Sequence, residues 1–366
     1  MLSFASRTSP ASATSYSKPY PKKNFSSNGQ GSGHFRLTLN PVTKPFQRIL
    51  SAVVFTLLGV GLMVWLYRGF DFRPLAQVFS QRSNYVWITL ALLAGVIANV
   101  FRSLRWRMLL RGAGLGISRW RAIELVFVSY LINSITPRLG ELVRSVMVRR
   151  GRMEDTAKAF GTVVIEKLAD VGCLVLVVAA AVLLRWEDTV GLFSRLSGRL
   201  AASAPGYAIY IIAGCVICLL VCLTLPRLSR VKVLLHNLWQ GIASIARLER
   251  PWGFWGLCAA IWMCNFLQLW LLIPSFEELS PLRIGDALYV FAAASIGVLL
   301  PTPSGAGPWH VAIVKCLTAV YHIPTELAKL FAFVTHAVPQ RFFQTLQMAV
   351  VSQSYLAGRR RSAKSD

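Results

Sequence analysis

Residues 120–144 read WRAIELVFVSYLINSITPRLGELVR, an apolar stretch that stops at Pro137 and Gly140 before it is long enough to cross a membrane. A spanning helix needs about 20 mainly apolar residues. Residues 284–308 read IGDALYVFAAASIGVLLPTPSGAGP, again a half-length apolar run that ends in prolines and glycines. Aligned without gaps, residues 120–137 and 284–301 are identical at Val126/Val290, Phe127/Phe291, Ile132/Ile296 and Pro137/Pro301. The two stretches therefore predict a pair of broken, re-entrant helices.

The composition of the whole chain is that of a membrane protein. Its 366 residues are 55% hydrophobic and 15% charged, whereas soluble domains carry about 25% charged residues. Long apolar runs predict spanning helices at residues 49–67, 85–101, 160–184, 207–225, 254–273 and 330–356. The net charge of +24 comes from Lys and Arg clustered between apolar runs, as in cytoplasmic loops. A nucleic-acid partner is therefore not expected.

The basic clusters indicate how the broken stretches lie in the membrane. The N-terminal segment is basic and free of acid, which places it in the cytoplasm. The clusters at residues 102–121 and 138–158 share that side only if residues 122–136 dip into the membrane and return. The acidic loop around Glu277 and Glu278 falls outside, so the second stretch enters from there. We expect an all-α, multi-pass membrane protein with about six spanning helices, two re-entrant helices in an inverted repeat (about eight apolar segments), and both termini cytoplasmic.

The same patterns divide the chain into three parts. Residues 1–48 are expected to form a disordered basic tail, residues 49–356 the transmembrane domain, with halves at 49–185 and 207–356, and residues 357–366 a basic C-terminal tail. The Arg- and Ser-bearing composition of the N-terminal tail also resembles a transit peptide. Whether the tail belongs to the mature protein therefore stays open.

The two breaks are the candidate binding site. Irregular backbone at membrane depth needs protein or a water-filled cavity around it, and inverted-repeat transporters place their sites at such breaks. The half-helix after each break presents free N–H groups, which favour an anion such as a headgroup phosphate. The residues concerned are Arg138, Gly140, Glu141 and Arg144 at the first break, and Ser304, Gly305, Gly307 and His310 at the second. The alternative is an ordinary turn and an external loop between complete spans.

Three more charged residues fall within apolar runs, where ionisable groups are costly and often functional. Glu166 and Asp170 lie one helical turn apart. Arg341 lies deep in the last run and needs either one of these acids or a lipid phosphate as partner. The alternative for the acids is an interfacial ion pair with a neighbouring arginine. No catalytic residue, metal-ligand spacing or cofactor site is predicted.

Three motifs occur in order along the chain: Asn133-Ser-Ile-Thr-Pro137-Arg138-Leu-Gly140-Glu141-Leu-Val-Arg144, Glu166-Lys-Leu-Ala-Asp170 and Pro301-Thr-Pro303-Ser-Gly305-Ala-Gly307. Together they resemble the lysylphosphatidylglycerol synthase transmembrane-region family. That is the flippase-like domain also found in the multiple peptide resistance factor. The resemblance implies a bacterial inner-membrane protein of lipid-flippase type, with these Arg, Glu and Asp positions near a headgroup site. Ser304-Gly305 and His310 replace the Gly-Gly and Glu usual in the second motif. The soluble aminoacyl-transfer domain is absent, so lysyl-lipid synthesis by this chain alone is not expected.

Three functions remain in competition. The first is a translocator of lipids or lipid-linked headgroups with an anion site at the two breaks, whose partners are anionic or phosphate-bearing membrane lipids. The second is an integral-membrane enzyme that modifies a phospholipid or polyprenyl-phosphate, with Glu141, Glu166 or Asp170 as acid–base groups. The third is a non-catalytic subunit of a cell-envelope complex, and a homo-oligomer is also possible.

Overall fold

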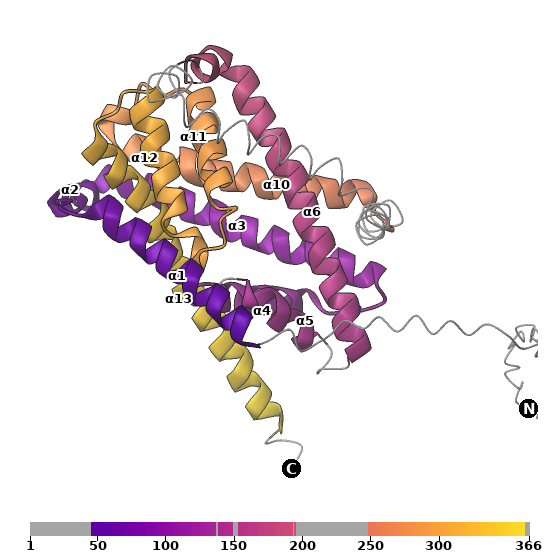
Figure 1. Ribbon diagram of the computed structural model, residues 1–366. Helices are drawn as coiled ribbons and strands as arrows, with labels where there is room; N and C mark the ends of the chain where they lie inside the picture. Colours follow the sequence, from indigo (N-terminus) through magenta and orange to yellow (C-terminus); the bar gives the residue numbers. More distant parts are fainter. Residues whose placement is uncertain (1–44, 137, 149–152, 193, 195–247, 363–366) are drawn as a thin grey trace, which may run out of the picture. The chain divides into compact units, whose positions relative to one another are not determined.

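The computed structural model describes residues 45–136, 138–148, 153–192, 194 and 248–362. All regular structure in these residues is helical (Figure 1), which confirms the expected all-α class. The predicted span at residues 207–225 and most of the predicted N-terminal tail lie outside the described residues. The elements are α1 (Pro45–Tyr67), α2 (Arg73–Ser80), α3 (Arg82–Gly112), α4 (Arg119–Asn133), α5 (Leu139–Met147), α6 (Met153–Leu184), α10 (Pro251–Trp270), η2 (Ile273–Ser275), η3 (Glu277–Leu279), α11 (Ile284–Gly297), η4 (Pro303–Gly305), α12 (Pro308–Val320) and α13 (Thr325–Ser362).

Three of the described helical segments are long and apolar enough to cross a membrane: Arg82–Gly112, Met153–Leu184 and Pro251–Ser275. They contain the predicted spans at residues 85–101, 160–184 and 254–273. The outer face of α6 exposes Val175, Leu176 and Leu183 by 61–73%, as expected of a helix that borders lipid. The predicted span at residues 49–67 corresponds to α1, whose described apolar part, Val53–Tyr67, is shorter.

The first broken stretch forms an antiparallel helix pair, α4 and α5. At its open end, the end of the pair away from the break, the Arg121 guanidinium donates to the Met147 carbonyl oxygen at 3.2 Å. At its tip Gly140 lies so close to Ser129 that an added Cβ would collide with the Ser129 carbonyl oxygen. The missing side chain at Gly140 therefore lets the two helices approach directly after the break.

The second broken stretch, α11 and α12, is built the same way. Near the tip, a Cβ on Gly297 would lie 2.7 Å from the Pro308 carbonyl oxygen, so this pair too meets backbone to backbone. At the open end both helices reach Arg185 at the end of α6. The Arg185 Nε lies 3.0 Å from Asp286 of α11, and its guanidinium lies 5.9 Å from the ring of Tyr321, which follows α12.

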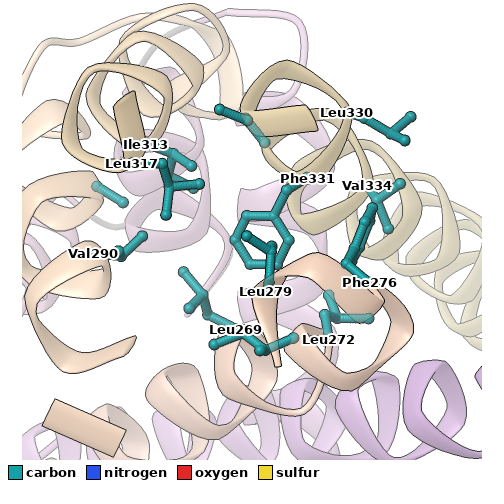
Figure 2. Close-up of a cluster of buried hydrophobic side chains, with 14 of the residues drawn as sticks. Leu269, Leu272, Phe276, Leu279, Val290, Ile313, Leu317, Leu330, Phe331 and Val334 are labelled. Atoms are coloured by element: carbon teal, nitrogen blue, oxygen red, sulfur yellow. The ribbon is translucent and has the colours of Figure 1, made fainter. Parts of the chain in front are cut away.

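The second pair rests on the largest buried apolar cluster of the described residues (Figure 2), where α10, α11, α12 and α13 meet. Ring packing contributes at its centre, because Phe276 and Phe331 lie edge to face at 5.3 Å. The pair is thus held in place by a packed core. The side chains labelled in Figure 2 are Leu269, Leu272, Phe276, Leu279, Val290, Ile313, Leu317, Leu330, Phe331 and Val334.

Candidate functional site

The tips of both helix pairs line a single cavity of about 340 Å³. The tips touch there, since the Arg138 Nη2 donates to the Leu299 carbonyl oxygen at 3.3 Å. Helices α3, α6, α10 and α13 complete the wall. Its polar residues are Asn99, Arg102, Tyr130, Asn133, Arg138, Glu141, Lys167, Asn265, Gln268, Thr302, Ser304, Gln340 and Gln347.

The charges of this wall favour an anion. Arg102, Arg138 and Lys167 face a single carboxylate, that of Glu141. Lys167 lies 3.2 Å from Glu141 and so takes the only carboxylate of the wall, which leaves Arg102 and Arg138 without an acidic partner in the wall. Arg102 lies over the Tyr130 ring at 5.5 Å, and neither arginine forms an ion pair with a described carboxylate. Guanidinium groups without a carboxylate partner are well suited to a phosphate.

Asn133, the last residue of α4, holds the first tip together. Its Oδ1 accepts the Gly140 N–H at 2.8 Å, and its Nδ2 donates to Glu141 at 3.1 Å. Between them Arg138 adopts a left-handed conformation, with φ 61°, which costs a non-glycine residue about 1–2 kcal/mol. The asparagine thus fixes the turn that presents Arg138 to the cavity.

Residues 298–307 form the second tip. Ser304 has φ 52°, and α13 holds it from two sides. Gln340 donates to its Oγ at 2.8 Å, and His336 Nε2 lies 3.0 Å from its carbonyl oxygen. On the α1 side the contact is backbone to backbone, because a Cβ on Gly307 would lie 2.8 Å from the Gly59 carbonyl oxygen.

A second group of charges lies beside the cavity but does not line it. Arg105 is fully buried and bonds both oxygens of Asp170, at 2.7 and 3.1 Å. It also lies 3.5 Å from Glu166, whose other oxygen accepts from Arg144 at 3.0 Å. The Arg144 guanidinium stacks 4.5 Å over the Trp106 ring. We call Arg105, Arg144, Glu166 and Asp170 the ion network.

The ion network ties α3, α5 and α6 together, and each carboxylate in it already has an arginine partner. This arrangement corresponds to the alternative given for Glu166 and Asp170 in the sequence analysis, an ion pair with a neighbouring arginine. A further role of these acids as headgroup ligands or acid–base groups stays a prediction. Arg105 was counted only as part of the basic cluster at residues 102–121, and its side chain is completely buried among helices.

The predicted site residues therefore divide by place. Arg138, Glu141, Ser304 and Gly305 line the cavity. Gly140 and Gly307 allow the close backbone contacts at the tips, and His310 is buried behind the second tip. Arg341 is exposed and lies outside the cavity wall. Among the described residues it has no ion pair with Glu166 or Asp170, which pair with Arg105 and Arg144 instead.

Sequence reasoning missed Arg102 and Arg105 as site residues and gave Lys167 no role. The signal for Arg105 was its spacing, because it falls on the buried stripe of α3 that includes Ala98 and Leu109, seven residues before it and four after. In the described part of the chain, no group of three or more His, Cys, Asp or Glu residues is placed to hold a metal ion.

Comparison with known proteins identifies relatives of the chain. The family model described as "Lysylphosphatidylglycerol synthase TM region" matches residues 48–346. A UPF0104 membrane protein of Methanocaldococcus jannaschii is 25% identical over 293 residues, which cover 73% of this chain and 83% of that protein. A UPF0104 membrane protein of Pyrococcus horikoshii is 30% identical over 95 residues, 25% of this chain and 28% of that protein. No solved structure matches the chain significantly. The resemblance seen in the motifs is thereby confirmed, and the chain belongs to the lysylphosphatidylglycerol synthase TM-region family of membrane proteins.

Proposed function

We propose that this chain translocates lipids or lipid-linked headgroups, and that it holds an anionic, phosphate-bearing headgroup in the cavity between the two tips. One observation carries the proposal: both tips line one polar cavity in which two arginines form no ion pair with a carboxylate of the described residues. Its volume of about 340 Å³ is within the range of about 300–1,000 Å³ usual for small-molecule sites.

In this proposal the α4–α5 pair enters the membrane from the cytoplasmic side and the α11–α12 pair from the opposite side, as an inverted repeat. The positive-inside rule supports the orientation, since several basic residues flank the first pair, whereas the segment before the second pair (271–283) has one, Arg283, and the segment after it (321–324) has no Lys or Arg. Both termini are then cytoplasmic. The membrane is the bacterial inner membrane.

The surface beside the cavity suits the apolar part of a lipid. Ile135 at the first tip is 73% exposed, and Leu299 and Leu300 at the second are 52% and 47% exposed. A headgroup in the cavity would leave its acyl chains against these side chains, so that only the polar part crosses through protein. Lys167 becomes a third phosphate ligand when it releases the Glu141 carboxylate and pairs with the lipid phosphate instead.

Reconstitution into liposomes tests the proposal. Fluorescent phosphatidylglycerol is placed in both leaflets, and dithionite quenching reports how fast the inner pool reaches the outside. We expect the wild-type chain to accelerate exchange and Arg138→Gln to slow it about tenfold, as the loss of one charge-assisted hydrogen bond predicts.

The matched control is Arg73→Gln, which removes the same charge from an arginine with a side chain that is 92% exposed. It should exchange lipid at the wild-type rate. No acceleration by the wild-type chain, with phosphatidylglycerol or with other headgroup classes, would rule out translocation.

A further inference from the structure

Two of the five histidines of the chain meet behind the second tip. The rings of His310 on α12 and His336 on α13 have centroids 4.7 Å apart. His310 is completely buried, and its Nε2 has no hydrogen-bond partner among the described residues. The anion site of the proposed function makes no use of this histidine pair.

The hydrogen bonds fix where protons already are. The Gly307 N–H donates to Nδ1 of His310 at 3.4 Å, so that nitrogen carries no proton. Nε2 of His336 lies 3.0 Å from the Ser304 carbonyl oxygen, which only accepts, so that nitrogen carries one. A further proton fits Nδ1 of His336, because both hydrogen bonds then survive. On His310 it would remove the bond from Gly307.

The groups around the pair supply no counter-charge for that proton. Tyr67 of α1 has its ring 5.7 Å from His310, but its hydroxyl donates to the Lys329 carbonyl oxygen. The Lys329 amine, on α13 like His336, pairs with Glu326. No carboxylate forms an ion pair with either histidine in the part of the chain that the structure describes. An anion nearby is therefore needed to stabilise the charged pair.

Ser304 connects the pair to the cavity. It lines the cavity, while its carbonyl oxygen is the partner of His336. Its hydroxyl accepts from Gln340, which lines the cavity as well. A phosphate held there is separated from the imidazole of His336 by this one residue.

We propose that the His310–His336 pair takes up one proton when an anionic headgroup enters the cavity, so that proton and lipid bind together. The inference rests on the proposed function, because the phosphate supplies the missing negative charge. The proton comes from solvent and adds to Nδ1 of His336, and no other bond is made or broken. Since binding consumes a proton, affinity for the lipid rises as the pH falls.

Calorimetry tests this on the purified full chain in phosphatidylcholine nanodiscs, with dioctanoyl phosphatidylglycerol as the probe. Titrations in two buffers of different ionisation enthalpy give the number of protons bound per lipid. For the wild type we expect proton uptake on lipid binding. As the pH is lowered from about 7.5 to about 6, the Kd for the lipid should fall by up to about tenfold for each pH unit.

His336→Gln keeps an N–H donor for Ser304 but cannot take the proton, so it should bind lipid with no proton uptake and a flat pH profile. The control is His322→Asn, at an exposed histidine with φ 54° in the turn before α13, which should keep the wild-type profile. Thermal unfolding checks that each variant is folded.

The outcomes separate the two proposals. Lipid binding without proton uptake in the wild type, or an unchanged pH profile in His336→Gln, overturns the proton site but not the anion cavity. No lipid binding at any pH overturns the anion cavity, and the linked proton with it. If His336→Gln does not fold, the two-buffer titration of the wild type decides alone.

Discussion

The ion network and the cavity wall contain similar side chains in a different balance. The network joins two arginines to two carboxylates, and Arg105, Arg144 and Glu166 are at most 3% exposed. The cavity wall has three cations and one carboxylate, and its arginines are accessible. The two clusters lie on neighbouring turns of α3, α5 and α6, but one is balanced in charge and buried, and the other is positively charged and accessible.

Charge in the ion network holds helices together, whereas the proposed function assigns the charge of the cavity wall to a ligand. Balanced and buried charges satisfy one another, and breaking one pair leaves a buried charge alone. The excess positive charge beside the open cavity is what the proposed function pairs with an anion from outside. Variants of the two clusters should therefore fail in different assays.

The largest effect is expected in the ion network. Arg105→Met leaves the buried Glu166 with one partner fewer and the partly buried Asp170 without its ion pair, and should cost about 3–5 kcal/mol of folding stability. Thermal unfolding in detergent, followed by tryptophan fluorescence, measures the loss, with Arg73→Gln as the charge-matched control. A variant that unfolds at the wild-type temperature would show that the network does not hold the helices together.

An intermediate effect is expected at the first tip. Gly140→Ala forces a methyl group against the Ser129 carbonyl oxygen, and overpacking of this kind costs about 1–3 kcal/mol. Lipid exchange should slow as well, since the turn that carries Arg138 must shift. Gly172→Ala on α6 is the control, because nothing lies within 4 Å of the added methyl group. Equal behaviour of the two variants would contradict the close packing of α4 on α5.

The smallest effect is expected at Arg341. Its side chain is exposed and outside the cavity wall, so Arg341→Gln should change folding stability by no more than about 0.5 kcal/mol. Lipid exchange should stay at the wild-type rate in the liposome assay. A loss as large as that of Arg138→Gln would mean that the binding region includes the exposed face of α13 that carries Arg341.

Much of the fold could be predicted from local sequence. The prolines and glycines of the two breaks mark where each helix stops, because proline removes a helical hydrogen bond and glycine permits turns and close contact. Arg138, Glu141, Ser304 and Gly305 line the cavity, since each lies in or next to a break. The expected inverted repeat stays a prediction of the sequence.

The pairing of charges could not be predicted in the same way. Helical spacing shows that Glu166 and Asp170 share a face of α6, but it does not show which helix packs on that face. Arg105 therefore went unnoticed as their partner, although it lies on the buried stripe of α3. Depth in an apolar run was likewise a poor guide to Arg341, because the rotation of α13 turns this side chain outward.

Cross-linking in intact membranes tests most directly whether the two tips meet around one cavity. In a background without native cysteines, Arg138→Cys and Leu299→Cys are combined and treated with a short bifunctional maleimide. The control combines Arg138→Cys with Leu183→Cys, which lies 16 residues and so about 24 Å along α6 from Lys167 of the cavity wall. We predict an intramolecular cross-link in the first pair and none in the second. No cross-link between residues 138 and 299, with both cysteines reactive, would contradict this prediction.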